Sequence, residues 1–497
     1  MKTLTILFFC LITTGICTAQ SLDGDFGIGG KVIMAGQGTI GSIIPLPNLK
    51  IVATCRFDTG IALMKFKENG TIDSSFATNG MYVAPHEIGL GKIILQPDGK
   101  ILSEGASWPP SSHESFHTMR FNVDGSVDNT FGTAGKVITR FDEFGNHEGH
   151  AIALQPDGKI VIAGSARGTT IGVARLLPDG TPDSSFSADG LYTFNTGLSN
   201  GDAKAVAVRS DGRIIVGGQT HNGTDQAFIA LCLLPDGSLD TAFNHTGYAA
   251  TIAGDIFNYV RAMKLQADGK IVMAGSGIFG AEGGNFTLIR YKTDGTLDNT
   301  FGTGGIVNID FYGNEDEAEC LTILPDNKIL VGGIATLTTN HKFAMVRLLP
   351  DGSLDHTFGS EGKIWTAMQD SSDFVNSIAV QPDNKIILAG ASTGIYYQRA
   401  MARYLPFATE LNEISGRLSE IILLPNPAKG MLYLHGEAMQ VRRITATNAA
   451  GITRNIEIEK NSGTINIQKM EEGLYIFRIF YVNNTIATQK IMIHTGK

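Results

Sequence analysis

The stretch Leu348–Gly362, LLPDGSLDHTFGSEG, decides the fold, because close copies of it occur seven times along the chain. Each copy contains the pattern Asp-x-x-Phe, and its Asp lies 50 to 58 residues from the corresponding Asp of the next copy. A period of this size is typical of a repeat architecture, in which each unit buries its apolar face against its neighbours. The seven positions are Asp23, Asp73, Asp128, Asp183, Asp240, Asp298 and Asp355.

Two further phrases recur in each period. One surrounds a PDG turn, as in LQPDGKIVIAG from Leu154, and the other ends in a basic residue, as in TIGVARLL from Thr170. Pro pre-sets φ and Gly accepts positive φ, so PDG predicts a tight hairpin. We read each unit as four strands: one after the FG turn (GKVITRF from Gly135), one before PDG, one after it, and one ending in RLL.

Four short strands repeated seven times predict an all-β fold, a seven-bladed β-propeller of four-stranded blades over residues 20–406. A β-solenoid is the alternative. Whether the ring closes by an exchanged strand or by simple contact is left open. The LDxxFGxxGK and LQPDGKIVVAG phrases resemble those of the delta-60 repeat family of extracellular bacterial proteins, over residues 21 to about 406. That resemblance implies a propeller and an exported location, and it implies no reaction.

The turn Asp is expected to accept backbone N–H bonds, and the Phe of the same pattern to wedge between blades. A calcium-binding loop is the competing interpretation, although each turn supplies only two carboxylates. The recurring basic residues are expected to pair with the turn Asp and tie the blades together, rather than to line a channel. They are Lys65, Arg120, Arg175, Arg290, Arg347 and Arg403, with Cys232 as the exception.

The amino terminus predicts export. Residues 1–19 combine Lys2, an apolar run and a small residue at Ala19, which is the pattern of a signal peptide that directs export to the periplasm. No other run is long enough for a transmembrane span. Cys55, Cys232 and Cys320 of the mature chain are expected to be buried thiols. The net charge of −9 argues against nucleic acid as a ligand. The sequence predicts no cofactor, no metal site and no catalytic residue.

Function is expected on the rim opposite the repeated turns, because the segments that differ between repeats gather there. A metal site at His147, Glu148 and His150 is weighed against an ordinary loop. A cation site, or an acid and base for a glycosidic bond, is weighed against a solvated acidic loop at Glu315, Asp316, Glu317 and Glu319. Exposed aromatic residues that stack on sugar rings are the preferred candidates. The candidate ligand-binding residues are Trp108, His147, His150, Glu315, Asp316, Tyr396 and Tyr397.

The carboxy-terminal part differs from the repeats. Residues 407–422 read as a linker, and residues 423–497 predict a small Ig-like β-sandwich. This part resembles the type A sorting domain of type IX secretion substrates, at Asn426, Pro427, Gly473, Leu474, Tyr475 and Lys490. The resemblance implies recognition by the secretion machinery of the outer membrane, followed by cleavage or anchoring, which stays open. A plain adhesion-type sandwich is the alternative.

Together these features predict a secreted or outer-membrane surface protein that binds an extracellular glycan or protein. Two alternatives are a polysaccharide hydrolase or lyase built on the propeller, and a structural protein of the envelope.

Overall fold

The computed structural model describes residues 21–85, 88–107, 114–143, 145–195, 199–221, 226–255, 258–278, 283–337, 339–394, 396–406, 422–429, 431–435, 441–448, 453–457, 464–481 and 486–493. The expected signal peptide, most of the linker and Trp108 lie outside these residues. The chain divides into two compact units, Met1–Phe407 and Ala408–Lys497. Among the described residues no helix is long and apolar enough to cross a membrane.

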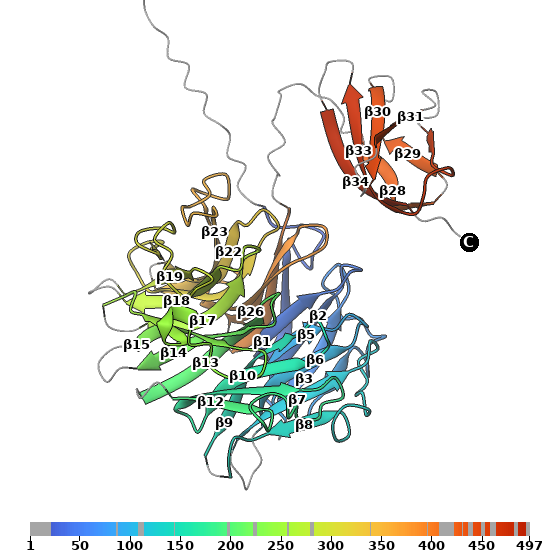
Figure 1. The fold of residues 1–497 in the computed structure, drawn as a ribbon. Helices are drawn as coiled ribbons and strands as arrows, with labels where there is room; N and C mark the ends of the chain where they lie inside the picture. Colours follow the sequence, from blue (N-terminus) through green and yellow to red (C-terminus); the bar gives the residue numbers. More distant parts are fainter. Residues whose placement is uncertain are drawn as a thin grey trace, which may run out of the picture. The chain divides into compact units, whose positions relative to one another are not determined.

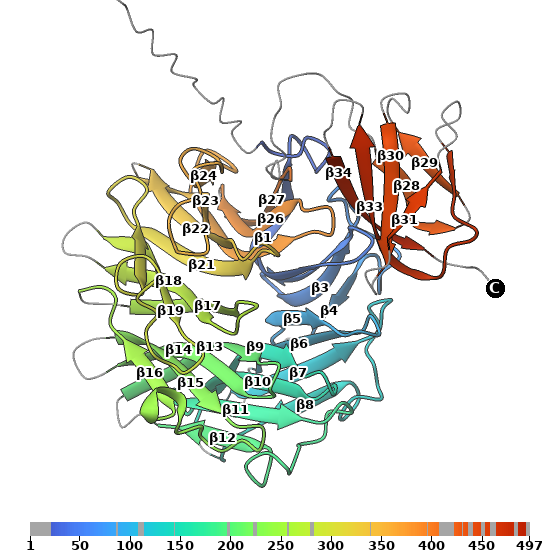
Figure 2. The ribbon, with the colours of Figure 1, turned by 45° about the horizontal axis from the view of Figure 1, so that its top comes forward.

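The first unit is a closed ring of seven antiparallel β-sheets, as predicted (Figures 1 and 2). The innermost strands are in contact around the whole ring, and Figure 2 shows them near its centre. These inner strands are β1 (Lys31–Pro45), β5 (Lys92–Leu95), β9 (His147–Leu154), β13 (Ser199–Val208), β17 (Asn258–Leu265), β21 (Asp316–Ile323) and β25 (Asp373–Val380).

Each blade continues outward from its inner strand. The second strands are β2 (Ile51–Phe57), β6 (Ile101–Ser107), β10 (Ile160–Ala166), β14 (Ile214–His221), β18 (Ile271–Ile278), β22 (Ile329–Leu337) and β26 (Ile386–Thr393). The third strands are β3 (Gly60–Phe66), β7 (Ser115–Phe121), β11 (Thr170–Leu176), β15 (Gln226–Leu233), β19 (Gly284–Tyr291), β23 (Asn340–Leu348) and β27 (Tyr397–Tyr404). The outer strands are β4 (Met81–Val83), β8 (Lys136–Thr139), β12 (Leu191–Phe194), β16 (Tyr248–Thr251), β20 (Ile306–Ile309) and β24 (Lys363–Thr366).

The order of strands within a blade corrects the sequence-based assignment. The strand after the FG turn is the outermost strand of the same blade and not the first strand of the next, since β12 pairs with β11. The Asp-x-x-Phe segment connects the third strand to this outermost strand, and its backbone forms hydrogen bonds with the third strand. In the third blade Asp183 N donates to Arg175 O, and Arg175 N donates to Gly190 O. The crossover between blades is therefore the variable segment.

The ring closes by an exchanged strand, which answers the question that the sequence left open. The first part of β1 pairs with β27 as the outer strand of the seventh blade, and its second part pairs with β2 as the inner strand of the first. Arg403 Nε donates to Asp23 Oδ2 at 2.8 Å, which joins the two ends of the propeller chain.

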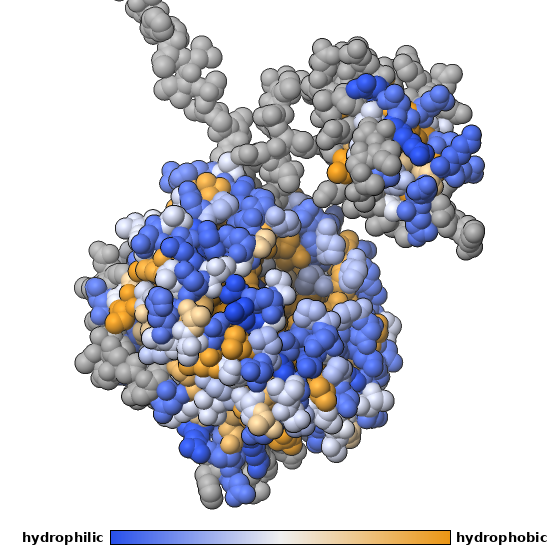
Figure 3. Space-filling view, viewed as in Figure 1, coloured by the Kyte–Doolittle hydropathy of each residue, from blue (hydrophilic) through white to orange (hydrophobic). Residues whose placement is uncertain are grey.

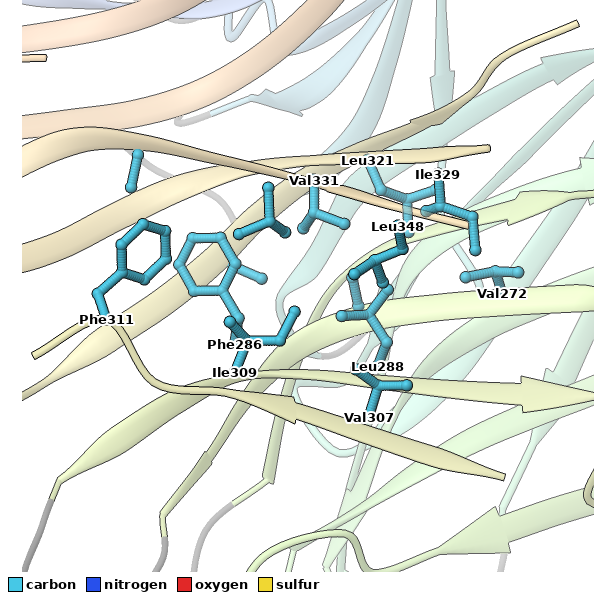
Figure 4. Packing of buried hydrophobic residues seen from close by; sticks show 14 of the residues in the cluster. Val272, Phe286, Leu288, Val307, Ile309, Phe311, Leu321, Ile329, Val331 and Leu348 are labelled. Atoms are coloured by element: carbon cyan, nitrogen blue, oxygen red, sulfur yellow. The ribbon is translucent and has the colours of Figure 1, made fainter. Parts of the chain in front are cut away.

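Apolar side chains between adjacent blades form the core (Figure 4). The largest cluster lies between the fifth and sixth blades and includes Phe286, Leu288 and Val331, all fully buried. The Phe of the repeated pattern wedges between blades as predicted. Phe76 packs against Gly125 of the next blade, where an added Cβ would lie 2.6 Å from the ring. Gly125 is thus required both for its φ of +86° and for this close approach.

The repeated turns share one rim, where ion pairs hold them together. In the second blade Arg120 Nε donates to Asp128 Oδ2 at 2.7 Å, and Lys100 Nζ lies 2.8 Å from the same oxygen. Arg120 Nη1 also donates to the carbonyl of Pro178 in the next blade, at 2.5 Å. The predicted pairing is confirmed for the five Arg positions, since it recurs as Arg175–Asp183, Arg290–Asp298, Arg347–Asp355 and Arg403–Asp23. The prediction is wrong for Lys65, because in the first blade Lys50 Nζ lies 2.8 Å from Asp73 Oδ2 and takes this role. These carboxylates are engaged by protein cations, so the turns are accounted for without calcium.

The fourth blade keeps the ion pair by an exchange of residues. Cys232 occupies the position at which the other blades have a basic residue. Arg213, which follows the PDG-type turn of this blade, occupies the position at which the other six units have Lys. Arg213 Nε donates to Asp240 Oδ2 at 2.7 Å, so the carboxylate retains a guanidinium partner. Cys55, Cys232 and Cys320 are free and buried, as predicted. Burial raises the pKa of the Cys55 thiol to about 12, so it stays protonated at neutral pH.

The second unit is a β-sandwich. One sheet contains β31 (Thr453–Ile456), β30 (Val441–Asn448), β33 (Gly473–Tyr481) and β34 (Ile486–Ile493). The other contains β28 (Ile422–Lys429), β29 (Met431–His435) and β32 (Thr464–Asn466). The two sheets are joined where β28 pairs in parallel with β34 at Ala428 and Ile493. Their facing apolar side chains form a core that includes Leu432, Tyr475 and Phe477. Of the predicted sorting-motif positions, Asn426 and Pro427 lie on β28, Gly473 and Leu474 begin β33, and Lys490 lies on β34.

Candidate functional site

The inner strands surround a central channel, and a β-bulge near the variable rim directs one residue of each of six inner strands into it. The register slips at Gly41, His150, Lys204, Arg261, Glu319 and Asn376. A bulge re-aims the side chain of its extra residue. The six positions are structurally equivalent, yet five of them carry different polar residues. This position is therefore a natural place for specificity.

The bulged residues line a recess of about 430 Å³ at the channel mouth. Arg56 of β2 and Lys92 of β5 add two more cations to its wall, and Glu148 and Glu319 are its two carboxylates. The recess continues into a deeper section of about 320 Å³, where Lys264 joins the lining. Because basic side chains outnumber acidic ones in both sections, the channel is electropositive in an acidic protein.

Most of these charges are paired within the channel wall. His150 Nε2 lies 3.3 Å from Asp202 Oδ1, and Lys204 Nζ lies 2.6 Å from Asp202 Oδ2. Arg261 Nε lies 3.4 Å from Glu319 Oε1. Burial raises the pKa of Glu319 to about 7, against the lowering effect of Arg261. A carboxyl group with such a pKa exchanges its proton near neutral pH.

An aromatic groove of about 790 Å³ opens from the same recess and shares Thr39, Arg56 and Asn376 with it. Tyr397 and Phe374 stand along this groove, with ring centroids 5.6 Å apart. The side chain of Tyr397 is 49% exposed. An exposed aromatic ring beside polar groups suits a ligand with both apolar and hydroxylated faces.

Two predicted site residues serve the fold instead. His147 and Asp316 occupy the same position at the start of their inner strands, and both side chains are 0% exposed. His147 Nδ1 accepts a bond from Arg167 N, and Asp316 Oδ2 accepts one from Phe311 N at 2.7 Å. His147 Nε2 also lies 3.3 Å from Asp142 Oδ1, so each of the two side chains holds a crossover segment and is buried away from a ligand. His147 and His150 also have different partners, which does not favour a shared metal site.

The other predicted residues are distributed over the variable rim. His150 lines the recess, and Tyr397 lines the groove. Glu315 is exposed and borders a smaller hollow together with Glu317 and Glu319. Tyr396 is 62% exposed and borders neither the recess nor the groove. Most of the propeller surface visible in Figure 3 is hydrophilic, with small apolar patches.

Sequence reasoning named His150, and Glu319 within the acidic cluster, but missed Lys204, Arg261, Asn376 and Lys92, although a signal was present. A polar residue stands four positions before the last residue of the strand that precedes the PDG-type turn in five repeats, as His150, Lys204, Arg261, Glu319 and Asn376. A strict alternation of inward and outward side chains along the strand does not predict which of these residues point into the channel, because the bulge shifts the alternation.

Six repeats of the propeller, at residues 96–131, 155–186, 209–243, 266–301, 324–358 and 381–406, match the model described as "Domain of unknown function (DUF5122) beta-propeller". Residues 423–494 match the model of a secretion system C-terminal sorting domain. The chain is therefore a β-propeller protein sorted for secretion. Its propeller belongs to the DUF5122 beta-propeller family, and its carboxy-terminal unit is a sorting domain of the type IX secretion system. The sorting domain supports secretion or display at the outer-membrane surface.

Solved structures with a similar chain path are distant. Virginiamycin B lyase from Staphylococcus aureus, as a catalytically inactive variant with quinupristin, has 11% identity and a TM-score of 0.44, over 75% of this chain and 98% of that one. An ulvan lyase from a new family of polysaccharide lyases has 10% identity and a TM-score of 0.42, over 76% and 96%. A protein of unknown function from Dyadobacter fermentans has 13% identity and a TM-score of 0.41, over 76% and 98%. These values give no information on a ligand or reaction. No curated protein matches the sequence.

Proposed function

We propose that this protein is an extracellular binding module whose ligand, a glycan or a protein, occupies the recess and the aromatic groove. One observation carries the proposal. Structurally equivalent bulges present different polar side chains at the channel mouth, whereas the opposite rim repeats one bonded turn. A rigid scaffold with diversified positions at one end is the usual arrangement of a binding surface.

Export belongs to the same proposal. Residues 1–19 act as a signal peptide for passage to the periplasm, and residues 407–422 link the propeller (20–406) to the sorting domain (423–497). The secretion machinery of the outer membrane is then the partner of the sorting domain, through the region of Asn426, Pro427, Gly473, Leu474, Tyr475 and Lys490. The support is the match of residues 423–494 to the sorting-domain family.

A glycan array probed with the mature full-length chain tests the binding function. Tyr397→Ala is expected to weaken binding to any glycan that the wild type retains, because it removes the exposed ring of the groove. Tyr312→Ala is the matched control, since Tyr312 is also an exposed tyrosine (55%) but lies outside the groove and the recess. Equal loss in both variants, or no loss in either, would contradict the proposed location.

Glu319 favours one alternative, a polysaccharide hydrolase or lyase. Its carboxyl group lies in the recess beside Arg261 and has a pKa of about 7, as a general acid or base requires. Incubation of each bound glycan with the protein, followed by analysis for shorter or unsaturated products, separates turnover from binding. Products that disappear in Glu319→Gln would establish the alternative.

A further inference from the structure

Lys92 and Lys264 are the two lysines of the channel wall that have no salt-bridge or hydrogen-bond partner among the described residues. By contrast, His150, Lys204 and Arg261 are paired. Burial lowers the pKa of both lysines, against the raising effect of nearby Glu319 on Lys92, and Lys92 lowers the pKa of Lys264 further. Lys264 is exposed to the solvent of the channel, and its charge and that of Lys92 repel each other. An anion that enters the channel would offset this repulsion and would stabilise both ammonium groups.

The cations lie at the inner end of a continuous path. Lys92 lines both the recess and the deeper section, and Lys264 lines the deeper section. The aromatic groove meets the recess at Arg56 and Asn376. A ligand that lies along the Tyr397 ring therefore has its end directed toward the channel.

Resting on the function proposed above, we infer that the ligand is an acidic oligosaccharide: a sugar ring stacks on Tyr397 while a carboxylate or sulfate group at its end enters the channel and pairs with Lys92 and Lys264. A neutral sugar would leave both ammonium groups without a salt-bridge partner. A small free anion would leave the aromatic groove unused. Only a ligand with both features uses the whole path.

Isothermal titration calorimetry with three probes tests this assignment: a short oligogalacturonate, the neutral oligosaccharide obtained by reducing its carboxyl groups, and sodium sulfate. The wild type is expected to bind the acidic probe at least about tenfold more tightly than the neutral one, as charge-assisted hydrogen bonds predict. Lys92→Met and Lys264→Met are each expected to lose about tenfold for the acidic probe and little for the neutral one. Tyr397→Ala should weaken both.

Lys67→Met is the matched control, because Lys67 is exposed on a repeated turn of the opposite rim and should leave all affinities unchanged. A second readout separates a binding role from a structural one. Without ligand, Lys264→Met should raise the Tm, since it removes one of two repelling charges, whereas a stabilising lysine would lower it on removal.

The outcomes distinguish the inference from the function on which it rests. Equal affinity for the acidic and neutral probes, with both lost in Tyr397→Ala, would overturn the acidic ligand and leave glycan binding intact. Sulfate binding as tight as that of the acidic oligosaccharide would overturn the participation of the groove. Absence of binding to every probe by the wild type would overturn the inference, and a negative glycan array would then refute glycan binding as well.

Discussion

Glu104 offers the sharpest test of the packing between blades. It lies on β6, where the equivalent residue of the third blade is Ala163, and its side chain is 0% exposed. Thr118 Oγ1 is 2.5 Å from Glu104 Oε2, while Oε1 lies against the backbone of Gly149 in the next blade, where an added Cβ would come within 1.9 Å. Burial raises the pKa of Glu104 to about 8, against the lowering effect of Thr118.

The carboxyl group is therefore protonated in the folded protein and ionises freely in the unfolded chain above a pH of about 4. Its contribution to stability is fully present below that pH and is lost as the pH rises toward 8. Each pKa unit corresponds to about 1.4 kcal/mol, so the loss between pH 5 and pH 8 amounts to roughly 4 kcal/mol. Glu104→Gln removes this loss, because the amide is neutral at every pH.

Urea unfolding of the wild type and Glu104→Gln at both pH values measures the effect. The free energy of unfolding of the variant should exceed that of the wild type by about 4 kcal/mol more at pH 8 than at pH 5. Burial lowers the pKa of neighbouring His117 to about 4, but this contribution is common to both proteins and cancels in the difference. Glu143→Gln, at an exposed position, is the control. Parallel pH dependence of wild type and Glu104→Gln would refute the reasoning.

Three predictions concern the turn rim. Asp23→Ala should lower the Tm by opening the contact with Arg403 that joins the chain ends, and calorimetry should show a broader, less cooperative transition. Arg213→Ala should cost roughly 3 kcal/mol in urea unfolding, because Asp240 would be left buried without its guanidinium partner. The hydrogen bond from Lys50 lowers the pKa of Asp73 to about 2, so its stabilisation is present above pH 4 and lost as the pH falls toward 2; Asp73→Asn should accordingly be less stable than wild type at pH 7, with a gap that narrows in acid.

The number of blades could be predicted from sequence because the turn chemistry is local and repeats seven times. The division of strands into blades could not. If the strand after the FG turn is assigned to the next blade instead of its own, the number of blades, the hydrophobic pattern and the turns stay the same. Only the backbone bonds of Asp183 and Arg175 to their own blade decide the pairing. Strand partners are a tertiary property, and a periodic sequence is compatible with more than one assignment.

The way in which the ring closes could also have been predicted from the sequence. The first copy of the repeated pattern, at Asp23, has no third strand before it, and Arg403 of the last strand has no pattern after it. Because each Arg requires a carboxylate, these two incomplete halves complete each other in the structure.

The recess was harder to predict. The variable rim was a correct place to look for exposed aromatic residues such as Tyr397, because diversity among loops is visible in the sequence. The channel residues are positioned by bulges, which shift Lys204 and Arg261 out of regular alternation. His147 and Asp316 were predicted as ligand-binding residues but are buried. In the sequence, a polar residue that bonds to a crossover segment cannot be distinguished from one that contacts a ligand.

The shared strand β1 has a consequence for the timing of assembly. The first part of β1 is synthesised early, but its partner β27 is the last strand of the propeller to be made. The ring therefore stays open until synthesis of the propeller is almost complete. Blades two to six are each built from one continuous segment, so the pairing of β1 with β27 that completes the seventh blade is the last step that the chain order permits.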